Sequence, residues 1–204
     1  EITIIGSGIA AVAAARSAMG AGAIVNMFDS DTYRLRAALK ELGNQTIGAS
    51  LHPRAVQKAF TTADVVIITD VNHPVKFNSD IVSTMKKGVI TFDLSCNEGT
   101  TFPSMPTVNL SAAKSGDNTI DGTTRVCYIH SGSAVPRTAA MALSDTFITM
   151  LDEIVTLDGV SNALKLSSGL QDAVFTFLGK VTNRKVAEVA RMRAVDIRLL
   201  LQFS

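Results

Sequence analysis

Several residue types are scarce in this sequence, and each shortage argues against a class of protein. The 204 residues include two cysteines, five prolines and 14 glycines, which argues against a disulfide-rich mini-protein, a collagen and a disordered low-complexity chain. No run of about 18 apolar residues occurs, so no membrane span is expected. The formal net charge of +1 provides no field that would attract nucleic acid or an acidic membrane surface. What remains is a globular chain of ordinary domain size.

The sequence also lacks an initial methionine and a secretory signal. It begins at Glu1, and an apolar strand pattern starts at Ile2, so we expect the chain to be part of a longer protein. A glycine-rich turn at Gly6 interrupts the first apolar stretch, which argues against a signal peptide. The two cysteines, Cys96 and Cys127, are expected to be reduced and buried, in keeping with a cytoplasmic location.

Short apolar runs alternate with amphipathic stretches through the first half of the chain. The runs are uniformly apolar, as in strands that are buried on both faces of a parallel sheet. Strands are expected at Ile2–Ile5, Ala23–Phe28, Gln45–Gly48, Val65–Thr69, Val89–Asp93 and Arg125–His130. Helices are expected between them, at Ile9–Met19, Thr32–Leu42, Pro53–Thr61 and Asp80–Met85. This alternation predicts an α/β fold, a Rossmann-type doubly wound parallel sheet with right-handed crossovers.

The second half of the chain has a mostly helical pattern. Residues 97–124, which contain prolines and glycines, are expected to be loop or short strand pieces. A long helix with an apolar stripe is expected at residues 136–155, because a proline at its first position suits a helix start. Further helices are expected at Val160–Leu166 and Asn183–Met192, with Thr182 as a candidate cap for the second.

The turn between the first strand and the first helix reads Gly6-Ser7-Gly8-Ile9-Ala10-Ala11, a G-x-G-x-x-A pattern. Gly6 permits a tight turn, Gly8 lets the backbone approach a pyrophosphate, and the helix dipole attracts the phosphate charge. Asp29, which lies 21 residues past Gly8 and precedes Ser30, can accept hydrogen bonds from the ribose of NAD. Together these residues predict an NAD site. Two alternatives remain, a glycine turn without a ligand and a methyltransferase-type site for another adenosine cofactor.

The charges around Asp29 favour NAD over NADP. A carboxylate repels the 2′-phosphate that distinguishes NADP from NAD. Arg34 and Arg36 follow on the next helix and could soften this preference. We interpret them as solvated charges on the helix surface.

Ligands of open parallel sheets bind beyond the carboxyl ends of the strands. The residues expected to contact the cofactor there are Thr69, Asp70, Val71, Leu94 and Ser131. Asn97 and His130 are expected to orient the reacting groups, although His130 could instead be a loop histidine that shapes the pocket. No metal site is expected, because the histidines have no partners at metal-ligand spacing and one carboxylate beside Asn97 is too few.

Motifs along nearly the whole chain resemble those of the alanine dehydrogenase/nicotinamide nucleotide transhydrogenase family. The family's second strand ends in Asp and is followed by a helix with R-L-R, as in the run from Asp29 to Arg36. Its M-K-x-G-x-V-I-x-D-V segment is similar to Met85–Leu94. Its D-G motif, strand and A-V-P-R-T segment are similar to residues 121–138, and its last segment to residues 169–188.

This resemblance implies a two-domain oxidoreductase that transfers hydride between the nicotinamide of NAD and an α-imino or keto acid. In the family, an N-terminal domain supplies the Arg, Lys and His that hold the substrate, and this chain has no counterparts of them. The chain would then comprise the NAD-binding domain, residues 1–135, and a C-terminal helical segment, residues 136–204, that packs on the N-terminal domain. The resemblance also implies an inactive fragment and a homo-oligomer. No nucleic-acid or membrane partner is expected, because of the net charge of +1 and the absence of a long apolar run.

The chain departs from the family pattern around the reaction centre. Asn97 stands where the family has a second Asp, and His130-Ser131-Gly132 stands where it has Asn-Met-Pro. The run from Ser95 to Gly99, together with His130, is similar to the opine-forming branch, such as carboxyethylornithine synthase. Two alternatives to an alanine dehydrogenase therefore stay open, an opine-type N-carboxyalkyl amino acid dehydrogenase and a non-catalytic nucleotide-binding module.

Overall fold

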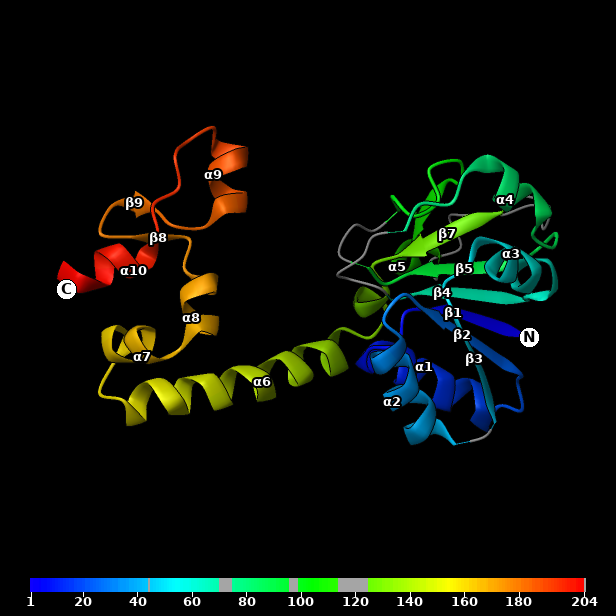
Figure 1. Cartoon of the computed structure of the whole chain (residues 1–204), viewed down its shortest axis with the longest axis horizontal. Coiled ribbons are helices and arrows are strands. Elements are labelled where there is room, and N and C mark those ends of the chain that lie inside the picture. The colour runs from blue at the N-terminus through cyan, green and yellow to red at the C-terminus, as the bar shows by residue number, and fades with distance from the viewer. Residues whose placement is uncertain (44, 70–74, 96–98, 114–124, 204) are drawn as a thin grey trace. The chain divides into compact units, whose positions relative to one another are not determined.

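A computed structural model describes residues 1–43, 45–69, 75–95, 99–113 and 125–203 of the chain (Figure 1). The chain divides into two compact units, residues 1–136 and residues 137–204. Each unit has buried apolar clusters of its own. No helix among the described residues is both long enough and apolar enough to cross a membrane.

A parallel sheet forms the centre of the first unit. Within the described residues it has seven strands in the order β3-β2-β1-β4-β5-β7-β6. The strands are β1 (Ile2–Ile5), β2 (Val25–Asp29), β3 (Thr46–Ser50), β4 (Val65–Ile68), β5 (Ile90–Asp93), β6 (Thr107–Asn109) and β7 (Val126–Ile129). This order reverses direction between β1 and β4, which is the doubly wound arrangement. The predicted α/β Rossmann-type fold is confirmed.

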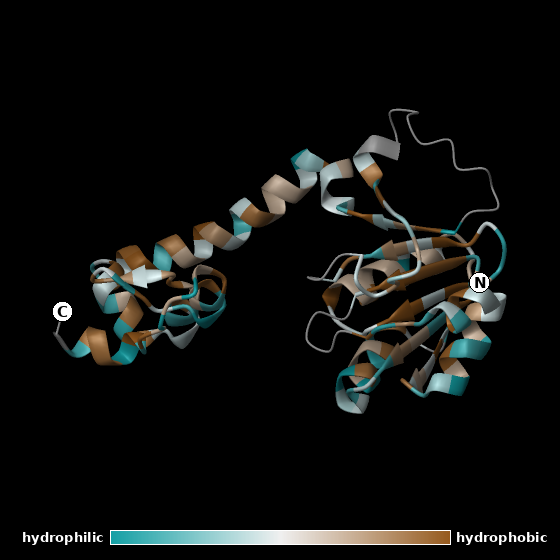
Figure 2. Cartoon of the chain, turned by 90° about the horizontal axis from the view of Figure 1, so that it is seen from above, coloured by the Kyte–Doolittle hydropathy of each residue, from teal (hydrophilic) through white to brown (hydrophobic). Residues whose placement is uncertain are grey.

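Helices cover both faces of this sheet (Figure 1). They are α1 (Ile9–Gly20), α2 (Thr32–Leu42), α3 (Pro53–Thr62), α4 (Ser79–Thr84) and α5 (Leu110–Ala113), followed by a 3₁₀ turn, η1 (Ser131–Ala134). Successive side chains of a strand point to opposite faces. Ile4 and Met27 accordingly pack with residues of α1 and α2, whereas Ile5 and Phe28 pack with residues of α3 and α4. The two resulting cores explain why the strands read as continuous apolar runs (Figure 2).

The element boundaries lie within two residues of those expected from the sequence. The shift that matters is in β2, which ends at Asp29 rather than at Phe28, so that Asp29 stands at the carboxyl end of the strand. Helix α2 then begins behind Asp31, whose carboxylate accepts hydrogen bonds from the backbone N–H groups of Tyr33 and Arg34, both at 3.0 Å. An Asp at this position satisfies N–H groups that the helix itself leaves without partners.

The second unit is helical apart from one hairpin. Its elements are α6 (Pro136–Thr156), whose first residue closes the first unit, α7 (Val160–Leu166), α8 (Ser168–Ala173), β8 (Thr176–Phe177), β9 (Lys180–Val181), α9 (Arg184–Ala190), α10 (Ile197–Leu200) and η2 (Leu201–Phe203). Leu164, Ile197 and Leu201 form its small core. One detail of the sequence interpretation is wrong. The cap of α9 is Asn183, which accepts from the N–H of Val186, whereas the hydroxyl of Thr182 donates to the Val174 carbonyl.

Helix α6 contains no buried residue along its 21 positions. Its apolar stripe is exposed, and the large side chains concerned are Met141, Leu143, Phe147, Ile148, Met150, Leu151 and Val155. The alternation of apolar and polar residues along this helix is visible in Figure 2. A contiguous apolar surface of this kind is typical of a helix that packs against another protein segment.

Candidate functional site

The strand order aligns the sequence-predicted residues along one edge of the sheet. Parallel strands end at the same edge, and β2, β1, β4, β5 and β7 are successive neighbours in the order of the sheet. Asp29 ends β2 and the glycine turn follows β1. Thr69, Leu94 and His130 follow β4, β5 and β7. The edge therefore presents an acid, then a phosphate-type turn, then the residues predicted to flank the nicotinamide, in the order that an extended dinucleotide requires.

The glycine turn leaves the N-terminus of α1 accessible. Gly6 has φ +105°, a backbone conformation that favours glycine, and its N–H donates to the Phe28 carbonyl at 2.7 Å. Gly8 precedes the helix with an ordinary φ of −76°, and a β-carbon added to it would meet no heavy atom within 4 Å. The chain's own backbone and packing therefore do not explain the glycine at this position. The N–H groups of a helix start and the open space beside them suit a phosphate.

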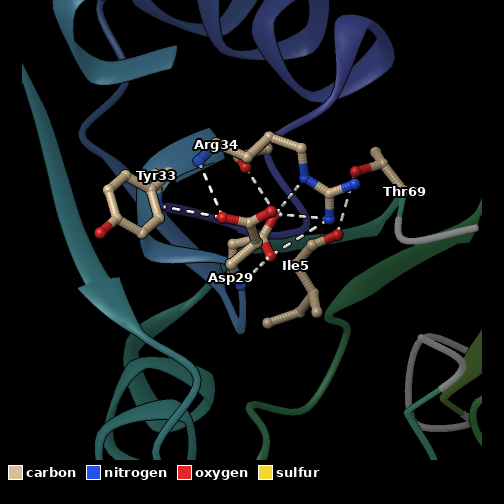
Figure 3. Close-up of polar contacts among 7 residues, drawn as sticks. Ile5, Asp29, Tyr33, Arg34 and Thr69 are labelled. Atoms are coloured by element: carbon tan, nitrogen blue, oxygen red, sulfur yellow. Dashed lines mark hydrogen bonds and ion pairs between the residues drawn. The ribbon is translucent and has the colours of Figure 1, made fainter. Parts of the chain in front are cut away.

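Among the described residues at this edge, the carboxylate of Asp29 accepts the most hydrogen bonds (Figure 3). Its side chain is fully buried. The Ser7 hydroxyl donates to Oδ2 at 2.5 Å, and the backbone N–H of Asp31 donates to Oδ1 at 2.8 Å. Arg34 contacts both carboxylate oxygens, with Nη2 at 3.0 Å from Oδ2 and 3.2 Å from Oδ1. The Asp29 carboxylate thus connects the glycine turn, the end of β2 and the first turn of α2.

The contact with Arg34 corrects the sequence interpretation of this residue. Arg34 is not merely a solvated surface charge, because it forms an ion pair with Asp29 and its side chain is only 31% exposed. Arg34 is the third residue of α2, and helical side chains lean toward the helix N-terminus. It therefore reaches back over the start of the helix to Asp29. Arg36, two positions later, is exposed, as the sequence interpretation expected.

Burial acts to raise the pKa of Asp29, but hydrogen bonds from Ser7 and the Asp31 backbone and the charge of Arg34 lower it by more, so the pKa lies below its ordinary value. A lowered carboxyl pKa stabilises the folded state above the unfolded value of about 3.9, and this stabilisation disappears as the pH falls through the folded value. We expect the free energy of unfolding of the wild type to fall more steeply below about pH 4 than that of Asp29→Asn. Urea unfolding at a series of pH values measures both slopes, and equal slopes would contradict the assignment.

The residues predicted to flank the nicotinamide are hydrogen-bonded to the ends of neighbouring strands. The backbone N–H and the hydroxyl of Thr69 both donate to the Ile5 carbonyl, at 2.8 and 3.0 Å. The N–H of Leu94 donates to the Ile68 carbonyl at 2.8 Å. Thr69 is buried and Leu94 is half-buried. The Thr69 hydroxyl thus serves the strand end itself, and it retains only acceptor capacity for a ligand.

Asp93 accepts two backbone hydrogen bonds after β5, a feature the sequence alone did not reveal. Its buried carboxylate accepts from the N–H groups of Ser95 and Gly99, both at 3.0 Å. Gly99 has φ +78°, and a β-carbon there would lie 2.5 Å from Cγ2 of Thr107. Asp93 therefore holds the backbone of Ser95 and of Gly99 at the end of β5. Within the described residues, the buried Ser95 hydroxyl has no hydrogen-bond partner, which leaves a polar group at this edge for a ligand or water.

His130 begins the 3₁₀ turn after β7. It is exposed, adopts a left-handed backbone conformation with φ 54°, and its carbonyl accepts from the N–H of Ser133 at 3.0 Å. Ser131 is half-buried in the same turn, and Ser30 and Ile9 are exposed beside the acid and the glycine turn. Their roles stay predictions. The other predicted site residues, Asp70, Val71 and Asn97, lie outside the described residues.

A surface depression adjoins the glycine turn between α1 and α2. Ser7, Gly8, Ile9 and Arg34 line it, and it extends to Arg16 and Glu41, which form an ion pair at 2.6 Å. A second, more polar depression lies in the helical unit and is lined partly by Asp172, Arg184, Lys185 and Arg198. None of the sequence-predicted site residues lies there. Among the described residues, no group of three His, Cys, Asp or Glu side chains could hold a metal ion.

Comparison with known proteins identifies the family. Residues 1–184 match the family described as "Alanine dehydrogenase/PNT, C-terminal domain". The chain belongs to this family. The match covers most of the chain, so the relationship inferred from the sequence motifs is confirmed, and with it membership in an oxidoreductase family.

The alignments with curated relatives cover nearly all of this chain. Alanine dehydrogenase 2 of Staphylococcus aureus is 26% identical over 206 aligned positions, which cover 99% of this chain and 55% of that protein. Alanine dehydrogenase of Staphylococcus saprophyticus is also 26% identical, with the same coverage. The chain thus spans about half the length of the curated relatives that it matches.

Several solved structures share the fold of this chain. An L-alanine dehydrogenase superposes with a TM-score of 0.73 at 20% identity, covering 93% of this chain and 52% of that one. The transhydrogenase from Sinorhizobium meliloti superposes with a TM-score of 0.64 at 18% identity, covering 90% of this chain and 49% of that one. The A chain of dipicolinate synthase from Bacillus subtilis gives 0.53 at 20% identity, with 76% and 46% covered. At these identities the likeness concerns the fold alone.

Proposed function

We propose that this chain is the NAD(H)-binding part of an amino-acid dehydrogenase related to alanine dehydrogenase. The observation that carries the proposal is the order of groups along the sheet edge, from Asp29 through the glycine turn to Thr69, Leu94 and His130. The complete protein would transfer hydride between the cofactor and an α-imino or keto acid. The family relationship supports this class of reaction.

The residues present fit a dinucleotide at two separate points. The open space at Gly8 beside the N-terminus of α1 suits a pyrophosphate, and the buried acid at the end of β2 suits a ribose. A bound nicotinamide would supply or accept the hydride. In this proposal Thr69 and Leu94 flank the nicotinamide ring, Ser131 contacts the cofactor, and His130 and Asn97 orient the reacting groups. Asp70 and Val71, which follow Thr69 in the sequence and lie outside the described residues, are proposed to contact the cofactor as well.

The exposed apolar side chains of α6 support the proposal that the second unit packs against another protein segment. Seven large apolar side chains of this helix are exposed, and so large an apolar surface is unusual for a helix that contacts only solvent. We propose that the C-terminal segment packs on a substrate-holding domain supplied elsewhere in the complete protein, and that the complete protein is a homo-oligomer. The substrate-holding residues would then lie outside residues 1–204, in a protein of the cytoplasm.

Turnover assays test the proposed reaction. Residues 1–204 alone are expected to show no oxidation of alanine by NAD, because binding a cofactor without holding the substrate gives no orientation of the reacting atoms. The complete protein is expected to oxidise NADH in the presence of pyruvate and ammonia. Efficient alanine deamination by residues 1–204 alone would contradict the proposal that cofactor binding and substrate binding belong to different parts of the complete protein.

An opine-type reaction is the second candidate, favoured by the run from Ser95 to Gly99 and by His130. In that reaction a keto acid condenses with the amino group of an amino acid, and the imine is reduced. The complete protein would then oxidise NADH with pyruvate plus ornithine or lysine, but not with pyruvate plus ammonia. A complete protein that binds NADH and is inactive with every such pair would instead be a nucleotide-binding module, a role that Asn97 in place of Asp would suit.

A further inference from the structure

A single carboxylate holds the segment that follows β5. Oδ1 of Asp93 accepts a hydrogen bond from the backbone N–H of Ser95, and Oδ2 accepts one from that of Gly99, both at 3.0 Å. The two N–H groups belong to residues that are four positions apart in the chain. An amide side chain could not hold both of them, because it has one oxygen and its NH₂ group would face an N–H group.

The charge at this position is costly to the folded state. Asp93 is fully buried, and no cationic side chain among the described residues forms an ion pair with it. Taking a carboxylate out of water is unfavourable unless charges and hydrogen bonds compensate for it. A neutral residue in an ordinary turn would avoid this penalty. Such departures from the most stable arrangement are expected at functional sites, so the geometry of this segment indicates a use beyond folding.

The segment lies on the predicted nicotinamide side of the sheet edge. It starts with Leu94, whose N–H donates to the Ile68 carbonyl at the end of β4, at 2.8 Å. At its other end Gly99 lies against β6, since a β-carbon there would be 2.5 Å from Cγ2 of Thr107. Asp93 therefore connects a residue proposed to flank the nicotinamide with a fixed point on β6.

We propose that Asp93 is a positioning residue for the nicotinamide half of the cofactor. It acts through the backbone of Ser95 and Gly99, which fixes the path of the chain directly after Leu94. The proposal rests on the proposed dinucleotide site and deepens it. Asp29 and the glycine turn serve the adenosine and pyrophosphate half, and within the described part of the chain they share no hydrogen bond with Asp93. Asp93 should therefore affect one half of the dinucleotide and not the other.

The test compares NADH with ADP-ribose, which has the same adenosine, pyrophosphate and second ribose but no nicotinamide. Calorimetry measures both affinities on the wild-type chain and on Asp93→Asn, in which one of the two N–H groups loses its acceptor. The variant is expected to bind NADH about five- to tenfold more weakly and ADP-ribose within about twofold of the wild type. A turn with a purely structural role would change both affinities alike or neither of them.

Thr91→Val is the matched control. Thr91 is also fully buried in β5, two residues before Asp93, and its hydroxyl has no hydrogen-bond partner among the described residues. Valine keeps the branched shape and removes this hydroxyl. The control variant is expected to bind NADH and ADP-ribose as the wild type does, and to unfold at the same or a slightly higher urea concentration.

Equal losses for NADH and ADP-ribose in Asp93→Asn, or no loss of NADH affinity, would overturn the inference and leave the proposed function in place. If Asp93→Asn fails to fold, the wild-type amide signals of Ser95 and Gly99 decide. They are expected to shift on titration with NADH and not with ADP-ribose, and shifts with both ligands or with neither would overturn the inference. A wild type that binds neither ligand contradicts the proposed function itself, so the two failures are distinguishable.

Discussion

Gly8→Ala is expected to weaken NADH binding roughly 100-fold, corresponding to about 2.7 kcal/mol, while the protein keeps its fold. The added methyl group meets nothing within 4 Å in the chain, and the backbone at this position is one that alanine adopts freely. The methyl group would, however, occupy the space into which a pyrophosphate must come to reach the N–H groups of α1. Titration by nicotinamide fluorescence measures the loss, and urea unfolding verifies the fold.

The other end of the same helix supplies the control for this prediction. Gly20 closes α1, and a β-carbon added there also meets nothing within 4 Å. Gly20→Ala should leave NADH affinity unchanged and stabilise the helix slightly, because glycine is a poor helix former. If Gly8→Ala bound NADH as tightly as Gly20→Ala does, the turn would not be a phosphate site.

Asp29→Asn is expected to weaken NADH binding roughly 10- to 100-fold, because hydrogen bonds from hydroxyls to a carboxylate are stronger than those to an amide. NADPH is expected to lose less or to bind more tightly. The substitution removes the carboxylate that repels the 2′-phosphate, and it releases Arg34 from an ion pair whose Nη2–Oδ2 distance is 3.0 Å. The ratio of the NADPH and NADH dissociation constants is the quantity to measure.

The same ratio distinguishes the loss of a ribose contact, which affects NADH and NADPH differently, from a general loss of structure, which affects both equally. Asn is close to Asp in size, so the packing around residue 29 should survive even though Ser7 and Arg34 lose a charged partner. An equal loss for NADH and NADPH would contradict the assignment of Asp29 to the ribose. Combining Asp29→Asn with Arg34→Gln in a double-mutant cycle would then show whether the two side chains act through each other.

The parts of the fold that the sequence predicted are those that depend on local patterns. The strands and the helices between them were expected within two residues of their observed bounds, because the strands are short, uniformly apolar runs and the helices are amphipathic stretches between them. The glycine turn and Asp29 were found from their spacing in the chain. Strand β6 has only three residues, of which only Val108 is apolar, so it forms no apolar run and the sequence indicated no more than short strand pieces around it.

The contacts around Asp29 could not be predicted in the same way. The Ser7–Asp29 hydrogen bond joins residues that are 22 positions apart, and it exists because β1 and β2 are neighbours in the sheet. One feature of the sequence could have indicated the contact between Arg34 and Asp29. Arg34 lies in the first turn of a helix that starts shortly after Asp29. A side chain there leans back toward the strand end. Asn183 and Thr182 are adjacent residues that both suit a helix cap, so the sequence alone could not decide between them.

A titration of the isotope-labelled chain with NADH, followed through the backbone amide signals, decides whether this sheet edge binds a nicotinamide dinucleotide. We expect saturable binding with a dissociation constant below about 1 mM, a usual range for enzyme ligands. The largest shifts should fall on residues 6–9 and 29–31, with further shifts at Thr69, Leu94 and His130. No binding, or shifts confined to residues 137–204, would contradict the assignment of this sheet edge to a nicotinamide dinucleotide.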